Sequence, residues 1–204
     1  MNGQQWEILL RVINGETVDP LPTGFIIDSP WLPGWFGCST LDYYTNDTIW
    51  FEANRKAIET FPDTMFLPGF WSEYGMCTEP SAFGAKCRWE EANLPHAEMI
   101  SDELDVLCKL PKPDVRKDGL LPFMMNRLKN MQPQINDMGH EIKFAVARGP
   151  LNIASFLMGT TELMMAMMED EEKVHQFIGM LSDFLTDWIE YQMEQFPSIE
   201  GILL

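Results

Sequence analysis

Apolar residues along the chain occur either in short continuous runs or in stripes with helical spacing. The short runs lie at residues 23–27, 64–67, 142–147 and 199–204, each next to Pro, Gly or acidic residues. Runs of this length predict β-strands, and the first run, 23–27, is a candidate for a buried strand. The stripes, in which apolar residues lie three and four positions apart, predict helices between these strands. The order is strand then helix, repeated four times, with no helix predicted after the last strand.

This alternation predicts an α/β protein, because strands that alternate with helices form parallel βαβ units. One helix is expected over residues 41–61, another over 120–138, and a long one begins after Asp170, a good N-cap. Residues 31–37 contain Pro and Gly among aromatic residues and predict a loop. The segment 70–85 predicts an irregular loop or broken helix, the kind of segment that carries function. The methionines between Met124 and Met193, including Met164, Met165, Met167 and Met168, are interpreted as core filler in preference to a cofactor-binding segment.

Composition and charge narrow the class of protein. The chain has 204 residues, 46% hydrophobic, and a net charge of −17. That charge repels phosphate backbones and anionic membrane surfaces, so neither nucleic acid nor a membrane is expected as a partner. No run of about 18 apolar residues occurs, which argues against a transmembrane helix. We expect an acidic cytoplasmic protein with four reduced cysteines, whose spacing forms no zinc motif.

Candidate site residues follow the predicted strands, because parallel strands present their chemistry where they end. The expected catalytic residues are Asp28, after the first strand, and Glu73, after the second. The expected substrate-binding residues lie after the second and third strands and are Trp71, Tyr74, Arg148, Asn152 and Ser155. Ser72 and Glu79 also follow the second strand and could converge in the same pocket. No metal ligand is assigned within the chain.

Several of these residues have a structural alternative. Asp28 precedes Ser29-Pro30 and is equally consistent with a turn, and Glu73 with a solvated loop charge. Arg148 is slightly more consistent with a structural ion pair. The segment from Gly149 to Asn152 is typical of a helix start, which attracts anions. No Ser/His/Asp or Cys/His constellation and no nucleotide-binding glycine pattern is present.

The third predicted strand and the helix after it resemble a known family. Ala147-Arg148-Gly149-Pro150-Leu151-Asn152-Ile153-Ala154-Ser155-Phe156-Leu157-Met158-Gly159 is similar to the third-strand motif of the uroporphyrinogen decarboxylase family. The opening helix with Asn14-Gly15-Glu16, Asp19 and Pro22, and the long helix after Asp170, fit the same family in order and spacing. The resemblance implies the N-terminal half, about four βα units, of a TIM (β/α)8 barrel. It implies one domain over residues 1–204, truncated at the C-terminus.

The family has two branches with different chemistry. One decarboxylates uroporphyrinogen without a cofactor, using arginines after the first strand, an aspartate after the second and a tyrosine in the third-strand motif. The other comprises corrinoid-dependent methyltransferases, which move a methyl group between a donor, a corrinoid protein and a thiol such as coenzyme M. That branch holds zinc with a His-x-Cys motif and a later Cys. Here those ligands would lie beyond residue 204.

This chain departs from the decarboxylase branch. No arginine follows the first strand, and Phe156 stands where the tyrosine is expected. The acidic and aromatic segment Phe70-Trp71-Ser72-Glu73 replaces the aspartate, whereas a carboxylate-rich pyrrole needs cationic partners. The methyltransferase branch is therefore favoured. It implies zinc, a corrinoid carried by a partner protein, and a small-molecule methyl donor or acceptor, with Asp28, Glu73 and Asn152 orienting the substrate.

Two alternatives to a methyltransferase stay open from the sequence. One is a uroporphyrinogen decarboxylase of porphyrin biosynthesis with an altered site. The other is a truncated, non-catalytic fragment that acts as a binding partner. Such a fragment would form oligomers, because four strands leave an open sheet edge, so a second copy of the chain is a further candidate partner.

Overall fold

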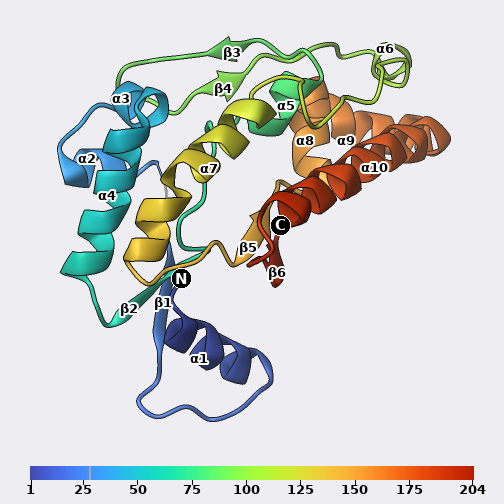
Figure 1. The fold of residues 1–204 in the computed structure, drawn as a ribbon. Helices are drawn as coiled ribbons and strands as arrows, with labels where there is room; N and C mark the ends of the chain where they lie inside the picture. Colours follow the sequence, from blue (N-terminus) through green and yellow to red (C-terminus); the bar gives the residue numbers. More distant parts are fainter. Residues whose placement is uncertain (28) are drawn as a thin grey trace.

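Short parallel strands lie inside an arc of helices in this protein. The computed structural model describes residues 1–27 and 29–204. Two parallel strand pairs are present: β1 (Thr23–Ile26) with β2 (Thr64–Leu67), and β5 (Phe144–Val146) with β6 (Gly201–Leu203). Figure 1 shows the arc formed around these pairs by α4, α7 and α10. All four predicted parallel strands are confirmed.

Helices connect the strands, and a small antiparallel hairpin runs across the top of the view in Figure 1, between α3 and α5. The hairpin consists of β3 (Cys87–Arg88) and β4 (His96–Ala97). The helices are α1 (Gly3–Ile13), α2 (Leu32–Phe36), α3 (Thr40–Thr45), α4 (Asp47–Thr60), α5 (Thr78–Ala82), α6 (Leu104–Leu107), α7 (Leu121–Asp137), α8 (Pro150–Met158), α9 (Thr160–Glu169) and α10 (Glu171–Gln195). The order βα, repeated with parallel pairing, confirms the α/β class. In the described part of the chain the strands form two separate parallel pairs, not one closed barrel.

The long helix α10 fixes the position of β5. Its buried stripe, which includes Phe177, Leu181 and Trp188, was expected from the sequence, and Asp170 caps it by accepting a hydrogen bond from the Lys173 amide at 3.2 Å. The buried Gln192 side chain donates to the Val146 carbonyl and accepts from the Val146 amide, both at 3.1 Å. These two bonds attach the end of β5 to the helix, so the residues that follow β5 start from a fixed point.

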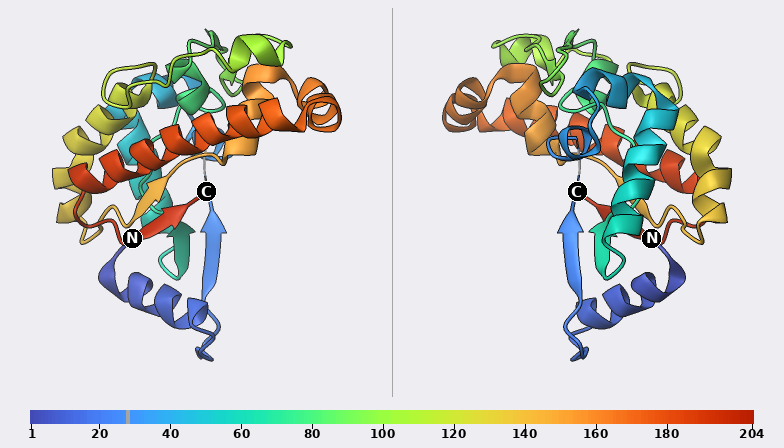
Figure 2. Two further views of the ribbon diagram at one scale, coloured as in Figure 1. Left: turned by 90° about the vertical axis from the view of Figure 1, so that its right-hand side faces the viewer. Right: turned by 90° about the vertical axis from the view of Figure 1, so that its left-hand side faces the viewer.

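Three local predictions were wrong. The first strand was expected to be buried, but β1 is exposed along its length, with Phe25 58% and Ile26 63% exposed. Figure 2 shows β1 and α1 extending away from the other helices, so little of the described chain covers β1. The predicted loop at 31–37 contains α2. The single helix at 41–61 is divided at Asn46, whose side chain accepts from the amides of Thr48 and Ile49 and starts a new helix there.

The methionine cluster in α9 is not core filler. Met164, Met165 and Met168 are 62%, 54% and 90% exposed. Gly159, with φ +100°, separates α8 from α9, and the two helices are bent by 106°. Only Leu163 and Ala166 of α9 are buried, so the face that carries these methionines points outward.

No single helix in the described residues combines the length and the apolar composition needed to cross a membrane. The bent pair α8 and α9 satisfies that test only when the two helices are taken together.

Gly119 makes a close approach that no other residue type can match. Its φ is +59°, and a Cβ added there would lie 2.4 Å from the Ala82 amide nitrogen at the end of α5. We expect Gly119→Ala to lower the free energy of unfolding by about 2–4 kcal/mol, because backbone strain and a backbone clash act together. Urea denaturation measures this. Gly179→Ala in α10, where a Cβ meets nothing within 4 Å, is the control and should stabilise the protein by up to about 1 kcal/mol. If the two substitutions changed the free energy of unfolding equally, the close contact between Gly119 and α5 would be contradicted.

His140 makes stability depend on pH. The residue is 7% exposed, and burial, aided by the positive charge of the Met1 amine, lowers its pKa to about 4. Between pH 6.5 and about 4 the unfolded chain therefore binds more protons than the native protein, so stability falls as pH falls through this window. The loss should approach about 3 kcal/mol at the acid end. The free energy of unfolding across this range should fall less steeply in His140→Gln than in the exposed His175→Gln, and part of the slope that remains in His140→Gln comes from the buried Met1 amine, whose pKa burial lowers to about 5.

Candidate active site

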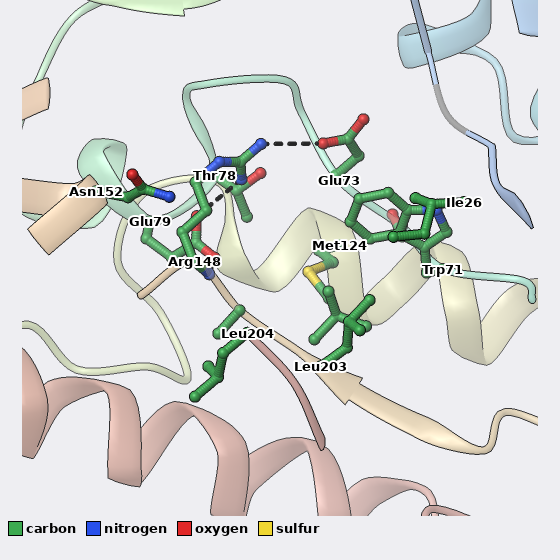
Figure 3. A pocket seen from close by; sticks show the side chains of 13 residues that line it. Ile26, Trp71, Glu73, Thr78, Glu79, Met124, Arg148, Asn152, Leu203 and Leu204 are labelled. Carbon is green, nitrogen blue, oxygen red and sulfur yellow. Dashed lines mark hydrogen bonds and ion pairs between the residues drawn. The ribbon is translucent and has the colours of Figure 1, made fainter. Parts of the chain in front are cut away.

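A cavity of about 200 Å³ lies where the strands end. Ile26, Val146 and Leu203 are the last residues of β1, β5 and β6, and all three line it. One wall is apolar and includes Trp71, Met124 from α7, and the ends of β1 and β6. The opposite wall is polar and carries Glu73, Glu79, Arg148 and Asn152 (Figure 3). The cavity therefore suits a ligand with an apolar group at one end and a polar group at the other.

Two carboxylates hold one guanidinium at the polar wall. Arg148 donates from Nη2 to Glu73 Oε2 at 3.2 Å and from Nη1 to Glu79 Oε2 at 3.1 Å. The backbone amide of Arg148 also donates to Glu79 Oε1 at 3.0 Å. The side chains of Glu73 and Glu79 are only 8% and 3% exposed, and that of Arg148 is 19% exposed. These ion pairs lie away from solvent, where breaking one of them has a large energetic cost.

The cluster of Glu73, Glu79 and Arg148 carries a formal charge of −1. Burial alone would lower the pKa of the Arg148 guanidinium, but the charges of Glu79 and Glu73 outweigh burial and raise it. Arg148 is the one cationic side chain among the described residues that line the cavity. Its charge is already matched by the two glutamates, so it is not free to neutralise an anionic ligand.

Hydroxyl groups hold the other oxygen of Glu73. Ser29 Oγ donates to Glu73 Oε1 at 2.8 Å, and the Tyr44 hydroxyl lies 3.3 Å from the same oxygen and donates to Ser29. Burial, reinforced by the negative charge of Glu73, raises the pKa of Tyr44, so its hydroxyl remains a donor. Both oxygens of Glu73 are thus fixed, which holds the carboxylate in one orientation.

The loop between β2 and α5 is shaped by its own hydrogen bonds. The Thr78 hydroxyl accepts from the Tyr74 amide at 2.8 Å. Between them, Gly75 has φ +55°, and a Cβ there would lie 2.7 Å from the Pro95 carbonyl oxygen. This tight turn places Glu73 and Glu79, six residues apart, on the same guanidinium. Ser72, which is 1% exposed and also lines the cavity, has no hydrogen-bond partner for its hydroxyl in the described residues.

Four of the residues predicted from strand ends meet in this cavity: Trp71, Glu73, Arg148 and Asn152. Glu73 is not a solvated loop charge, because its carboxylate is buried and paired. The structure also contains the ion pair with a neighbouring acid that was the alternative interpretation of Arg148. Whether these residues act on a substrate stays a prediction.

Two predicted site residues lie elsewhere. The Tyr74 ring packs against Tyr44 and Trp89, with the Arg127 guanidinium 4.9 Å from its centre, because the turn at Gly75 directs it away from Glu73. Ser155 does not line the cavity, and its hydroxyl donates to the Asn152 carbonyl one turn earlier in α8. Asp28 lies outside the described residues.

Sequence reasoning named Glu79 among the strand-end residues that could share a pocket but gave it no role, and it did not assign Ser29, Tyr44 or Met124 to the site. Glu79 carried a signal, since an acidic residue between Thr78 and Pro80 is typical of a helix start inside a functional loop. Tyr44 and Met124 belong to helices α3 and α7, and only the packing of these helices brings them to the strand ends.

The described residues contain no group of three or more His, Cys, Asp or Glu side chains that could hold a metal ion. The four cysteines are free thiols. The residues present therefore do not fit a zinc centre.

Comparisons with known proteins place the fold. Residues 4–196 match the family described as Uroporphyrinogen decarboxylase (URO-D). No curated protein matches the chain in sequence. Among solved structures, the chain is similar to a methyltransferase from Methanosarcina mazei, with a TM-score of 0.69 and 16% sequence identity. The match covers 95% of this chain and 56% of that one, so the chain spans about half the length of that structure. By the extent of the family match, the chain belongs to the uroporphyrinogen decarboxylase (URO-D) family.

Proposed function

We propose that this protein takes part in methyl transfer, as a corrinoid-dependent methyltransferase of its family that moves a methyl group to a thiol or corrinoid acceptor. The observation that carries the proposal is the charge of the cavity. Two buried carboxylates face one guanidinium, opposite an apolar wall. A methyl group is small and apolar and needs no cationic partner. The fold similarity to a protein named as a methyltransferase supports the same choice.

The polar wall is proposed to orient the substrate, and the apolar wall to receive the methyl group. Glu73 is fixed by Arg148, Ser29 and Tyr44, so the cluster presents a preorganised net negative charge toward the methyl carbon, which carries partial positive charge while its bond to the donor atom breaks and its bond to the thiolate or cobalt acceptor forms. Trp71 and Met124 form the apolar side of the same space. Asn152, which is exposed at the start of α8, can donate or accept a hydrogen bond at the entrance.

Zinc belongs to this branch of the family, but the described residues do not fit it. We therefore assign no step to a metal in this chain. A corrinoid would reach the cavity on a partner protein, and its methyl donor and acceptor would be small molecules. We also propose a cytoplasmic location for this activity, where a thiol acceptor stays reduced.

The same charge argument opposes decarboxylation of a carboxylate-rich pyrrole. Such a substrate needs cations that are free to pair with it, and Arg148 is already held by Glu73 and Glu79. We expect the purified protein to convert no uroporphyrinogen to less carboxylated pigment, as followed by chromatography of the oxidised porphyrins. Formation of such a pigment at a rate above the protein-free control would refute the choice of branch.

A further inference from the structure

Two of the four cysteines lie together beside the loop that carries the site residues. Cys77 immediately precedes α5, and Cys87 is the first residue of β3, ten positions later in the sequence. The Cys77 thiol donates a hydrogen bond to the Cys87 sulfur, and neither residue belongs to a disulfide. Neither lines the cavity at the strand ends, so the proposed methyl transfer makes no use of this pair.

Backbone hydrogen bonds bring the two thiols to one place. The Ala85 amide donates to the Pro80 carbonyl at 3.2 Å, so the chain folds back on α5 just before it enters β3. The Met76 amide donates to the Pro95 carbonyl at 3.0 Å, which attaches the residue before Cys77 to the residue that precedes β4. Both cysteines are thus held where α5 meets the hairpin. Sulfur atoms that already share a hydrogen bond can form a disulfide without a large backbone movement.

The two thiols differ in access and in charge. Cys77 is fully buried, whereas Cys87 is only half-buried. The hydrogen bond between them, together with burial, raises the pKa of Cys77, so this thiol keeps its proton. The same hydrogen bond lowers the pKa of Cys87 against the opposing effect of burial. Because the thiolate is the nucleophile in sulfur chemistry, Cys87 is suited to attack an oxidant from solvent and Cys77 to complete the reaction.

The other two cysteines have surroundings of the opposite kind. Burial, reinforced by the negative charge of Asp42, raises the pKa of Cys38. Burial, reinforced by the negative charge of Asp105, raises the pKa of Cys108, whose thiol donates to the Lys173 carbonyl at 3.5 Å. Both thiols therefore stay protonated at neutral pH and provide internal controls for the pair.

We propose that Cys77 and Cys87 form a reversible redox site whose oxidant is a low-molecular-mass disulfide such as glutathione disulfide. The Cys87 thiolate attacks one sulfur of the oxidant, the S–S bond breaks, and one glutathione thiolate leaves and takes up the Cys77 proton. The Cys77 thiolate, favoured by the nearby charge of Arg148, then attacks the Cys87 sulfur and displaces the second glutathione thiolate. The two protein sulfurs are oxidised, and one disulfide is reduced to two glutathione molecules.

The disulfide would tie the start of α5 to the hairpin. Cys77 lies between Glu73 and Glu79 in the sequence, so the bond would form within the segment that carries both carboxylates of the cluster. The Cys77 side chain makes no hydrogen bond that caps α5, so oxidation removes no such support from the helix. Disulfides of cytoplasmic proteins are mostly transient and sense redox conditions. The proposal is independent of methyl transfer.

Incubation of the purified protein with an excess of glutathione disulfide at neutral pH tests the proposal. We expect titratable thiols, counted after denaturation, to fall from four to two, and the mass to fall by that of two hydrogen atoms. Peptide mapping should link Cys77 to Cys87, and dithiothreitol should restore all four thiols. A protein that keeps four thiols, stops at a mixed disulfide with glutathione, or links other cysteines within or between chains would overturn the proposal.

Variants assign the roles of the two sulfurs. Cys77→Ala should stop at a mixed disulfide between Cys87 and glutathione, because the second thiol is missing. Cys87→Ser alters a half-buried position that the fold should tolerate, and it should leave the buried Cys77 unmodified. Cys38→Ser is the matched control and should form the Cys77–Cys87 disulfide as the unaltered protein does. Thermal unfolding verifies that each variant is folded. Modification of Cys77 in folded Cys87→Ser, or loss of the disulfide in Cys38→Ser, would contradict the assignment.

Discussion

Replacing Arg148 with methionine should lower the free energy of unfolding by about 3–5 kcal/mol, the usual cost of removing one partner of a buried ion pair. Methionine keeps much of the length of the side chain but leaves Glu73 and Glu79 without their cation. Their side chains are 8% and 3% exposed, so solvent cannot replace the lost guanidinium. The substitution also breaks the side-chain bonds that join Arg148, two residues after β5, to Glu73 in the β2–α5 loop and to Glu79 in α5.

Chemical denaturation of Arg148→Met and of the unaltered protein at pH 7 tests this expectation. The matched control is Arg116→Met, which removes an exposed arginine that pairs with Glu194 at 2.8 Å, with side chains 59% and 55% exposed. That change should cost about 1 kcal/mol or less, because surface ion pairs contribute little. If both substitutions cost the same, the cluster at Arg148 is not a buried network.

Glu73→Gln should reduce the rate of methyl transfer on the order of 10²-fold, the typical effect of removing one preorganised electrostatic group. The change conserves shape and removes one negative charge that faces the cavity. It also places an amide where Oε1 now accepts from Ser29 at 2.8 Å and Oε2 accepts from Arg148 at 3.2 Å. The loss should appear mainly in kcat if Glu73 acts in the transition state, and mainly in KM if it only holds the substrate.

The control for this variant is Glu59→Gln, which alters a glutamate of α4 whose side chain is 57% exposed and pairs only with Arg55. It should leave the rate unchanged. Thermal unfolding of both variants shows whether a lower rate comes from the missing charge or from a protein that no longer folds. A normal rate in a correctly folded Glu73→Gln protein would remove Glu73 from the proposed mechanism.

The sequence predicted the site residues that follow strands directly. Trp71, Glu73, Arg148 and Asn152 each lie within a few positions of a predicted strand end, and parallel strands bring such positions together. Tyr74 was assigned wrongly because it is next to Glu73 in the sequence. The positive φ of Gly75 turns the chain there, and a single sequence does not specify in which direction neighbouring loop side chains point.

Burial of the first strand could not be predicted either. A run such as Phe25-Ile26-Ile27 is typical of a covered strand, yet β1 is exposed because few described residues pack against it. The roles of Glu79 and Tyr44 in the site were equally hard to predict from the sequence. Their roles depend on how α5 and α3 pack against the strand ends, which is a property of the tertiary structure and not of local pattern.

The acidic cavity at the strand ends is proposed to serve methyl transfer. The rate at which the purified protein moves the methyl group of methylcobalamin to a thiol such as coenzyme M tests this role. Loss of the methyl–cobalt absorbance and mass spectrometry of the methylated thiol measure this rate. We expect protein-dependent formation of the methylated thiol that falls in Glu73→Gln and not in Glu59→Gln. A rate no greater than that of the protein-free mixture, or one that Glu73→Gln leaves unchanged, would contradict the claim.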